Sequence, residues 1–336
     1  MTLKDIAKQV GVSKTVASAV LNKKENQGIF VSEEKKKKIL ELSKRLGFLP
    51  RKSAKELITG KTNTIGVIAQ LLTPYFSNLI EQLQKASFSK GYDIVLYLTE
   101  GIPEKEEQFL ETMVDGRVDA VIITGFTEGS EMRCKKFSMP PYNLRILNMT
   151  QPIDGLINVH FDEMKAGKIA AEYFMKTGCQ KLCIVGGNPN FGRCRGFISF
   201  ANENGLNVEM MFDAPFSGYY EDGLKFARKI LKMKSLPDGV FAFNDVVGVG
   251  LISEFVENGI KIPEDISIIS CDNTQVCLYT NPSMSSIETK LKQRAKIAID
   301  ILHEKLENEK PKKNTFLLEP ELILRKSTKI LQEMKI

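Results

Sequence analysis

The sequence predicts two kinds of domain: a small all-α unit at the amino terminus and a larger α/β region of two lobes with parallel sheets. Three observations predict this arrangement. The 336 residues are too many for one ordinary core and suit two or three. Helical periodicity dominates residues 1–49, whereas short Val/Ile-rich segments alternate with amphipathic helices after Thr64. Positive charge is concentrated near the start of the chain.

Net charge separates the two regions. Residues 1–61 contain 15 Lys and Arg against 6 Asp and Glu, a charge of +9. The remaining 275 residues contain 32 and 35, a charge of −3. Clustered positive charge on a small unit is typical of proteins that bind phosphate backbones. The alternative is a solvated lysine-rich helix face, for example at Lys35–Lys38.

Two short helices joined by a turn are predicted first. Thr2 and Asp5 have the spacing of a capping box, and Gly11 can end the first helix in the left-handed conformation. Ser13 can cap a second helix, in which apolar residues recur at helical spacing. This pattern predicts a helix-turn-helix, the unit that places its second helix in the major groove of DNA.

A third helix and a basic linker follow. Acidic residues in its first turn and apolar spacing predict a helix from Ser32 to Gly47. In the linker, residues 50–61, a short basic segment at Lys52–Ile58 carries one exposed apolar residue, Leu57. So short a helix is marginal alone, so we expect it to form only when something binds it.

Alternating strands and helices are predicted for residues 62–330. Seven apolar segments are predicted strands: residues 64–70, 92–98, 118–124, 145–149, 181–187, 239–244 and 266–272. The predicted helices between them include Phe76–Lys90, Phe161–Lys176 and Asp245–Asn258. The strands have few polar residues and long connections, as parallel strands buried on both faces do. Turn residues near 155–165 predict a division into two lobes with a ligand cleft between them.

The remaining composition predicts a cytoplasmic protein. No stretch reaches 18 consecutive apolar residues, and the first residues lack the apolar core of a secretion signal. The six cysteines form no CxxC pair, so we expect reduced, mostly buried thiols.

An ordered set of motifs resembles the LacI/GalR family of transcriptional regulators. The amino-terminal signature is matched by LKDIAKQVGVS, SAVLN, VSEE, LGFLP and GKTNTIGVI. The family's periplasmic-binding-protein-like sensor domain is matched by TPYFSNLI, RVDAVII, RCRGF, FNDVVGVG, IPEDISIISCDN and LEPELILRKST. The resemblance covers essentially the whole chain. It implies a regulator, most simply a repressor, that assembles as a homodimer or a larger oligomer. Its affinity for a pseudo-palindromic operator in double-stranded DNA would be controlled by a small ligand.

The resemblance also implies the domain boundaries. A helix-turn-helix headpiece would occupy residues 1–49, a hinge helix and linker residues 50–61, and an effector-binding and dimerisation domain residues 62–330. The N-lobe would take about 62–160 plus 288–318, and the C-lobe about 161–287 plus 319–330. A ligand that bridges both lobes would favour one interlobe geometry and so set the spacing of the two hinge helices.

Family positions in the headpiece match residues of this chain. The base readers match Lys14, which can donate to guanine, Thr15, which can also offer a methyl to thymine, and Ala19, which can give only an apolar contact. Val16 stands where the family usually has Thr and cannot donate to a phosphate. The predicted DNA-binding residues are Thr2, Ser13, Lys14, Thr15, Ser18, Ala19, Asn22, Lys52, Ala54 and Leu57.

The hinge residues imply a bent operator. Leu57 matches the leucine that wedges into the minor groove at the operator centre, which favours flexible pyrimidine–purine steps. Ala54 would let the two hinge helices approach each other.

Five positions match the family's effector pocket: Phe76, Phe161, Arg193, Asn244 and Asp272. A forked donor, a bidentate acceptor, an amide and two apolar rings suit a polyhydroxylated ligand, a sugar or sugar derivative. Arg193 and Asp272 could instead pair with each other. A regulator that responds to a nucleobase or nucleoside, or to no ligand, is the alternative.

Two other classes fit less well. A transport protein of the sensor fold should carry a signal peptide and no basic headpiece. An enzyme is disfavoured because the only histidines are His160 and His303, and no GxSxG or Walker motif is present. The sequence therefore predicts no catalytic activity, no metal and no cofactor.

Overall fold

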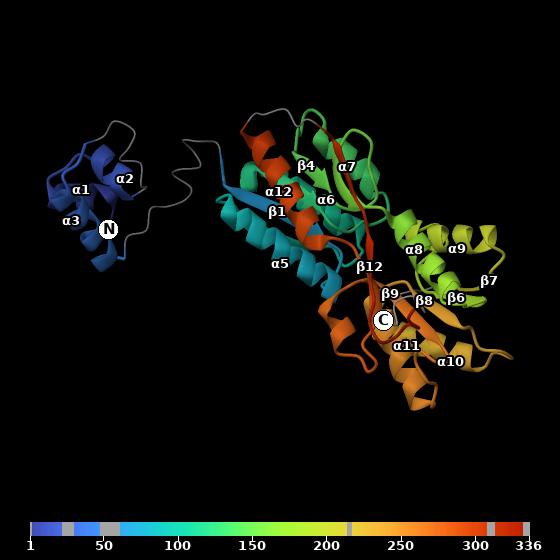
Figure 1. Cartoon of the computed structure of the whole chain (residues 1–336). Helices are drawn as coiled ribbons and strands as arrows, with labels where there is room; N and C mark the ends of the chain where they lie inside the picture. Colours follow the sequence, from blue (N-terminus) through green and yellow to red (C-terminus); the bar gives the residue numbers. More distant parts are fainter. Residues whose placement is uncertain (1, 22–29, 48–60, 214–216, 308–312, 332–336) are drawn as a thin grey trace. The chain divides into compact units, whose positions relative to one another are not determined.

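The computed structural model describes residues 2–21, 30–47, 61–213, 217–307 and 313–331, and the chain divides into two compact units, Met1–Thr62 and Asn63–Ile336. The first unit consists of helices (Figure 1). They are α1 (Leu3–Val10), α2 (Lys14–Leu21) and α3 (Glu33–Arg45). Their small apolar core is formed by Ile6, Val20, Ile39 and Leu42. The predicted three-helix headpiece is therefore confirmed in its described part.

Local hydrogen bonds define the ends of α1 and α2. The Asp5 carboxylate accepts a hydrogen bond from the Thr2 N–H at 2.8 Å. Gly11 has a φ of 69°, in the left-handed region that glycine adopts cheaply. Ser13 Oγ accepts a hydrogen bond from the Val16 N–H at 3.2 Å. These contacts end α1 and start α2 where the sequence predicts.

Two six-stranded sheets build the second unit. The N-lobe sheet has the order β11-β5-β4-β3-β1-β2, and its neighbouring strands are all parallel. The C-lobe sheet has the order β12-β10-β9-β8-β6-β7, and only β12 is antiparallel, to β10. The N-lobe strands are β1 (Thr64–Ala69), β2 (Asp93–Leu98), β3 (Ala120–Ile123), β4 (Ile146–Asn148), β5 (Ile157–Phe161) and β11 (Thr315–Leu318). The C-lobe strands are β6 (Lys181–Val185), β7 (Asn207–Met211), β8 (Gly239–Ala242), β9 (Ser267–Asp272), β10 (Ser285–Glu288) and β12 (Glu321–Ile323).

Helices cover both faces of each sheet. The N-lobe helices are α5 (Pro74–Ser89), α6 (Pro103–Thr112), α7 (Ser130–Ser138) and α12 (Leu291–Leu306), with a short π turn at Met113–Arg117. The C-lobe helices are α8 (Glu163–Lys176), α9 (Gly192–Glu203), α10 (Tyr220–Leu231) and α11 (Asp245–Glu257), with a 3-10 turn, η2, at Gln275–Leu278. One apolar core lies on each face of each sheet. This two-lobed α/β architecture with mostly parallel sheets confirms the predicted fold class.

The chain passes between the lobes after β5, after β10 and after β11 (Figure 1). Each lobe is therefore assembled from separate stretches of sequence. The carboxyl ends of β5 and β10 both lie where the chain leaves one lobe for the other, so residues that follow these strands are placed between the lobes.

Several predicted boundaries are wrong. The helix predicted from Phe161 begins at Glu163. Phe161 is the last residue of β5, and the Asp162 side chain caps α8 by accepting a hydrogen bond from the Lys165 N–H at 2.9 Å.

The sequence did not predict five of the strands: β5, β7, β10, β11 and β12. β2 was expected to be buried on both faces but is an edge strand, in which Asp93 and Val95 are exposed.

All six cysteines are buried free thiols, as predicted. Burial raises the pKa of Cys134 and that of Cys183 to about 12, so these thiols stay protonated near neutral pH. No helix in the described part of the chain is both long and apolar enough to cross a membrane.

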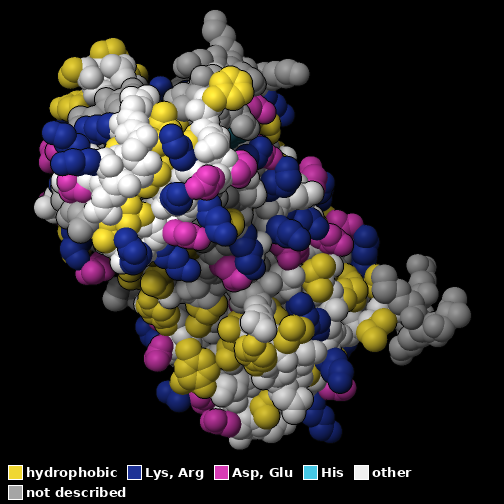
Figure 2. All heavy atoms as spheres, turned by 90° about the vertical axis from the view of Figure 1, so that its left-hand side faces the viewer, with side chains coloured by type: hydrophobic (Ala, Val, Ile, Leu, Met, Phe, Trp, Pro, Cys, Tyr) yellow, Lys and Arg dark blue, Asp and Glu magenta, His cyan; other side chains and the backbone are white. Residues whose placement is uncertain are grey.

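Apolar side chains also gather on the surface of the C-lobe, in the lower part of Figure 2. Val256, Leu278 and Tyr279 of α11, η2 and the following turn are 48%, 58% and 72% exposed. Large apolar side chains clustered this way are typical of a surface that a partner covers.

Candidate DNA-binding surface and effector site

The second helix of the headpiece exposes two of its predicted base readers. Lys14 and Thr15 are exposed on α2, while Ala17 and Val20 are buried in the headpiece. Ala19 is only 6% exposed, so its methyl offers little surface to DNA. An exposed lysine and threonine in the first turn of α2 can reach base edges, because recognition helices read DNA with their amino-terminal residues.

Thr2, Ser13 and Ser18, the predicted DNA-binding residues with exposed or half-buried hydroxyl groups besides Thr15, differ in what their hydroxyls can still donate. Thr2 Oγ1 donates to Asp5 at 2.9 Å, so a phosphate would compete with this carboxylate. Ser13 Oγ accepts a hydrogen bond from the Val16 N–H, which leaves the Ser13 O–H able to donate. Ser18 is half-buried and already takes part in a polar interaction. Asn22, Lys52, Ala54 and Leu57 lie outside the described residues.

Three of the four lysines in the run at Lys35–Lys38 of α3 pair with glutamates of the same helix. Lys38 Nζ lies 2.6 Å from Glu34 Oε1, and Lys37 Nζ lies 4.0 Å from Glu41 Oε1. Exposed pairs of this kind are typical of a solvated helix face. For α3, the structure therefore favours the solvated-face interpretation over a phosphate-binding surface.

Arg193, on α9, is the centre of a buried ion-pair network in the C-lobe. Its Nε and Nη2 donate to the Glu163 carboxylate at 2.6 and 2.9 Å. Its Nη1 donates to the Phe243 carbonyl oxygen at 2.9 Å and to Asp272 Oδ1 at 3.3 Å. The Arg193–Asp272 pair that the sequence left open is therefore present. Glu163 was missed, although its place directly after the lobe crossing was a signal for it.

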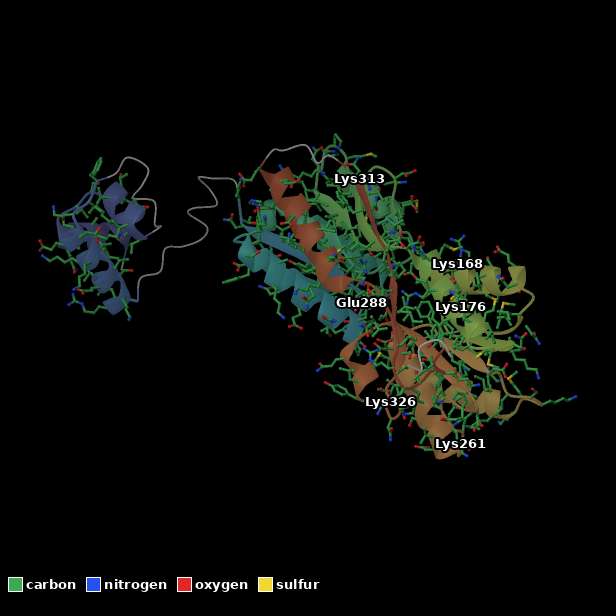
Figure 3. All side chains as sticks on the ribbon, in the orientation of Figure 1. Lys168, Lys176, Lys261, Glu288, Lys313 and Lys326 are labelled. Atoms are coloured by element: carbon green, nitrogen blue, oxygen red, sulfur yellow. The ribbon has the colours of Figure 1, made fainter. Side chains whose placement is uncertain are left out.

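Glycines allow this network to form. A Cβ atom at Gly167 of α8 would lie 1.8 Å from the Arg193 carbonyl oxygen, and one at Gly196 of α9 would lie 1.9 Å from that of Met164. The two helices are thus in backbone contact. Lys168 and Lys176, labelled in Figure 3, are exposed on the same helix as Gly167. The close approach of α8 and α9 brings Glu163 against Arg193.

Asp272 ends β9 in a strained conformation that the neighbouring loop maintains. Its φ is 120°, a region that L-residues rarely adopt. The buried Asp245 carboxylate accepts hydrogen bonds from Ser270 Oγ at 2.6 Å, from Ser286 Oγ at 2.6 Å and from the Thr274 N–H at 2.6 Å. These bonds tie β9, β10 and the loop after Asp272 together. The sequence alone did not predict this role of Asp245.

Side chains of the N-lobe meet this network around the Phe161 ring. The guanidinium carbons of Arg193 and Arg294 lie 5.6 and 5.2 Å from the ring centroid. Arg294, on α12, donates to Tyr75 Oη at 2.8 Å and to the Met149 carbonyl oxygen at 2.6 Å. Burial raises the pKa of the Tyr75 phenol. We call Tyr75, Phe161, Glu163, Arg193, Asp272 and Arg294 the interlobe cluster.

Phe76 and Asn244 are the other two predicted effector residues, and their contacts are different. Phe76 is half-buried and packs edge-on against Tyr75, with ring centroids 5.2 Å apart. Asn244 caps α11 by accepting from the Val247 N–H at 2.9 Å and donates to the Gly218 carbonyl oxygen at 3.0 Å. The structure therefore brings Phe161, Arg193 and Asp272 together, adds Phe76 at the edge, and gives Asn244 a structural role.

Comparison with known proteins agrees with this architecture. A family model described as bacterial regulatory proteins, lacI family, matches residues 2–51, and one described as a periplasmic binding protein-like domain matches residues 171–328. The chain is 30% identical to the HTH-type transcriptional repressor PurR of Pasteurella multocida, over 98% of each protein. It is 29% identical to PurR of Photobacterium profundum, over 98% of this chain and 99% of that protein.

Solved structures show the same fold. The lac repressor dimer bound to operator and the anti-inducer ONPF superposes with a TM-score of 0.85 at 19% identity, over 98% of this chain and 99% of that one. CcpA of Lactococcus lactis gives a TM-score of 0.69 at 24% identity, over 79% and 99%. From its sequence, its fold and these relatives, this chain belongs to the LacI family and is a DNA-binding transcriptional repressor, not an enzyme.

Proposed function

We propose that this repressor binds a pseudo-palindromic operator as a homodimer and that a small effector, held at the interlobe cluster, controls its operator affinity. One observation carries the proposal. Tyr75 and Arg294 of the N-lobe meet Arg193 and Asp272 of the C-lobe around Phe161, where the chain crosses between lobes. A ligand at this place contacts both lobes and therefore favours one of their relative arrangements.

A purine or purine derivative is our first candidate for the effector. Relatives at 29–30% identity carry the name PurR, which points to purines. The aromatic rings of Phe76 and Phe191 could stack on a planar heterocycle, and Phe191 is 41% exposed. A carbohydrate is the second candidate, because the paired Arg193 and Asp272 side chains supply donors and an acceptor suited to hydroxyl groups.

Effector control should depend on Asp272. In the Asp272→Asn variant, we expect effector affinity to fall by about 10- to 100-fold, because a charge-assisted hydrogen bond to the ligand is weakened. Operator affinity without effector should stay within about twofold, since Asp272 is not part of the headpiece. Calorimetric titration with purines and sugars, together with fluorescence anisotropy on an operator selected from random DNA, measures both quantities.

The control for this experiment is Asp154→Asn, the same chemical change at an exposed position. It should leave both affinities unchanged. If Asp272→Asn responds to every effector as the unmodified protein does, the effector does not bind at the interlobe cluster.

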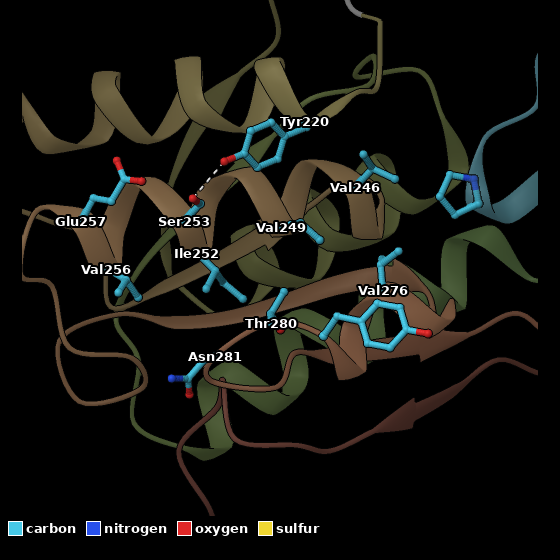
Figure 4. Close-up of a pocket in the computed structure, with 12 residues that line it drawn as sticks. Tyr220, Val246, Val249, Ile252, Ser253, Val256, Glu257, Val276, Thr280 and Asn281 are labelled. Carbon is cyan, nitrogen blue, oxygen red and sulfur yellow. Dashed lines mark hydrogen bonds between the residues drawn. The ribbon is translucent and has the colours of Figure 1, made fainter.

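The proposed dimer uses the apolar surface of the C-lobe. A groove of about 540 Å³ lies along α11 and η2, and its walls are mainly apolar. Figure 4 shows Val249, Ile252 and Val256 along one side and Val276 opposite, while Tyr220 donates to Ser253 Oγ at 2.9 Å. A second copy of the chain is the occupant that we propose, because a headpiece this small makes too few phosphate contacts alone and a symmetric pair fixes their spacing.

Tyr279→Asp should weaken this dimer. Tyr279 lines the groove and is 72% exposed, so its ring can be buried by a partner, and a carboxylate there would be desolvated without a counter-charge. We expect the dimer dissociation constant to rise by at least about 30-fold, an effect of roughly 2 kcal/mol. Operator affinity should fall with it. Sedimentation velocity and anisotropy measure the two effects.

Lys261→Ala is the matched control, because it also lowers the net charge by one and its exposed position is not part of the groove (Figure 3). An unchanged dimer in Tyr279→Asp would show that this face is not the interface.

A further inference from the structure

Arg294 is a buried, charged side chain in the second unit, and its contacts do not explain why a charge is buried there. It is 1% exposed, on α12 of the N-lobe. Two of its nitrogens donate to uncharged oxygens, those of Tyr75 and Met149. Its Nε has no hydrogen-bond partner among the described residues. A buried polar atom without a partner is unfavourable by about 1–3 kcal/mol, so this atom requires an explanation.

The two arginines of the interlobe cluster differ in their counter-charges. Arg193 contacts two carboxylates, those of Glu163 and Asp272. Within the described residues, no carboxylate forms an ion pair with Arg294. Both acids of the cluster are thus engaged by one arginine.

A purely structural role accounts for only part of this arrangement. The bonds to Tyr75 and Met149 tie α12 to α5 and to the segment before the lobe crossing. A water molecule could satisfy Nε, but it would not neutralise the guanidinium. A neutral side chain with two donors would hold the same two oxygens without a buried charge. The charge itself therefore indicates an anion that none of the described residues supplies.

We infer that the effector carries an anionic group, a phosphate or a carboxylate, that pairs with Arg294. The inference rests on the proposed effector site and narrows its ligand to an acidic derivative. The guanidinium carbons of Arg294 and Arg193 both lie within 5.6 Å of the Phe161 ring centroid, so a molecule that binds beside this ring would lie near both charges. The anionic group would pair with Arg294, while the Asp272 and Arg193 side chains contact the uncharged part of the same ligand.

Matched ligands test this inference with the full-length protein. The pairs are inosine and inosine 5′-monophosphate, ribose and ribose 5-phosphate, and glucose and glucuronate. Calorimetric titration should show that at least one acidic member binds the unmodified protein about tenfold or more tightly than its uncharged partner. Arg294→Met should remove this difference, and Arg294→Lys should keep part of it. The phosphate and carboxylate pairs distinguish the two kinds of anion.

Inorganic phosphate provides a second measurement that needs no organic ligand. At equal ionic strength, phosphate in place of chloride should raise the Tm of the unmodified protein more than that of Arg294→Met. Both proteins share the basic headpiece and the general salting effect of phosphate, so the difference isolates Arg294. Circular dichroism checks that the variant folds, and Arg294→Gln, which also removes the charge, replaces it where it does not.

Two outcomes would overturn the inference. One is an uncharged ligand that binds the unmodified protein and Arg294→Met equally. The other is an equal phosphate effect on both proteins without any preference for an acidic ligand. Either result leaves the proposed function intact if Asp272→Asn still weakens effector binding as expected. These experiments can therefore contradict the anionic ligand without contradicting the proposed effector site.

Discussion

Operator affinity is expected to fall by about 10³- to 10⁵-fold between 50 and 200 mM salt. Proteins that make six to ten phosphate contacts show losses of this size, because each contact releases condensed counterions from the DNA. Here the charge of +9 lies within residues 1–61, and the rest of the chain carries −3. The attraction therefore comes from the headpiece and linker, and the proposed dimer would double it. Anisotropy titrations across this salt range measure the slope.

Two lysine variants separate DNA contact from surface charge. Lys14→Ala removes an exposed lysine at the start of α2, and it should reduce the logarithmic salt slope by about one if Lys14 meets a phosphate, or relax the base preference if it meets a guanine. Lys37→Ala makes the same charge change on α3, where the side chain is 79% exposed near Glu41, and it should change neither. A salt-independent affinity would contradict the electrostatic account of binding.

The headpiece could be predicted from sequence because local contacts determine its helices. The partners of Thr2, Gly11 and Ser13 lie within a few residues of each, so spacing alone was informative. The alternating order of strands and helices in the second unit was visible for a similar reason. Its central strands are continuous apolar runs, such as the four buried residues of β3.

The strands that the sequence did not predict include β10, which contains buried polar residues. Ser285 and Ser286 of β10 are fully buried, although their hydroxyls give the segment a polar appearance. Partners that are distant in sequence satisfy those hydroxyls: Asp245 accepts from Ser286 Oγ at 2.6 Å, and Thr328 Oγ1 lies 2.9 Å from Ser285 Oγ. Hydrophobic periodicity cannot detect a buried strand whose polar groups are paired through the tertiary fold.

The sequence also predicted only part of the effector site, because some of its contacts depend on the tertiary fold. Arg193, Phe161 and Asp272 were identified through a family resemblance, and the structure places them together. Arg294 was missed because it belongs to a stretch rich in lysine, LKQRAK, that resembles the solvent face of an amphipathic helix. Glu163 was missed because its distance from Arg193 along the chain is thirty residues and only the packing of α8 on α9 joins them.

Gly167→Ala is expected to lower the free energy of unfolding of the second unit by about 3 kcal/mol or more. The added methyl carbon would lie 1.8 Å from the Arg193 carbonyl oxygen and 2.6 Å from the Phe197 amide nitrogen. Both are backbone atoms, so α8 and α9 must separate. Glu163 would then move away from Arg193, and effector affinity should fall together with stability. Denaturant unfolding and calorimetric titration measure the two losses.

Whether Gly167→Ala is less or more stable than the unmodified protein decides between a steric clash and intrinsic helix propensity. In an unobstructed helix interior, alanine stabilises relative to glycine by about 0.5–1 kcal/mol, so intrinsic helix propensity alone predicts a more stable variant. Lys176→Ala on the same helix is the control: it removes only an exposed pair with Glu172 at 2.6 Å and should change stability by less than about 1 kcal/mol. A stabilised Gly167→Ala variant would mean that α8 and α9 are not in backbone contact. The ion pair between Glu163 and Arg193 would then depend on the remaining close contact of the two helices, that of Gly196 with the Met164 carbonyl oxygen.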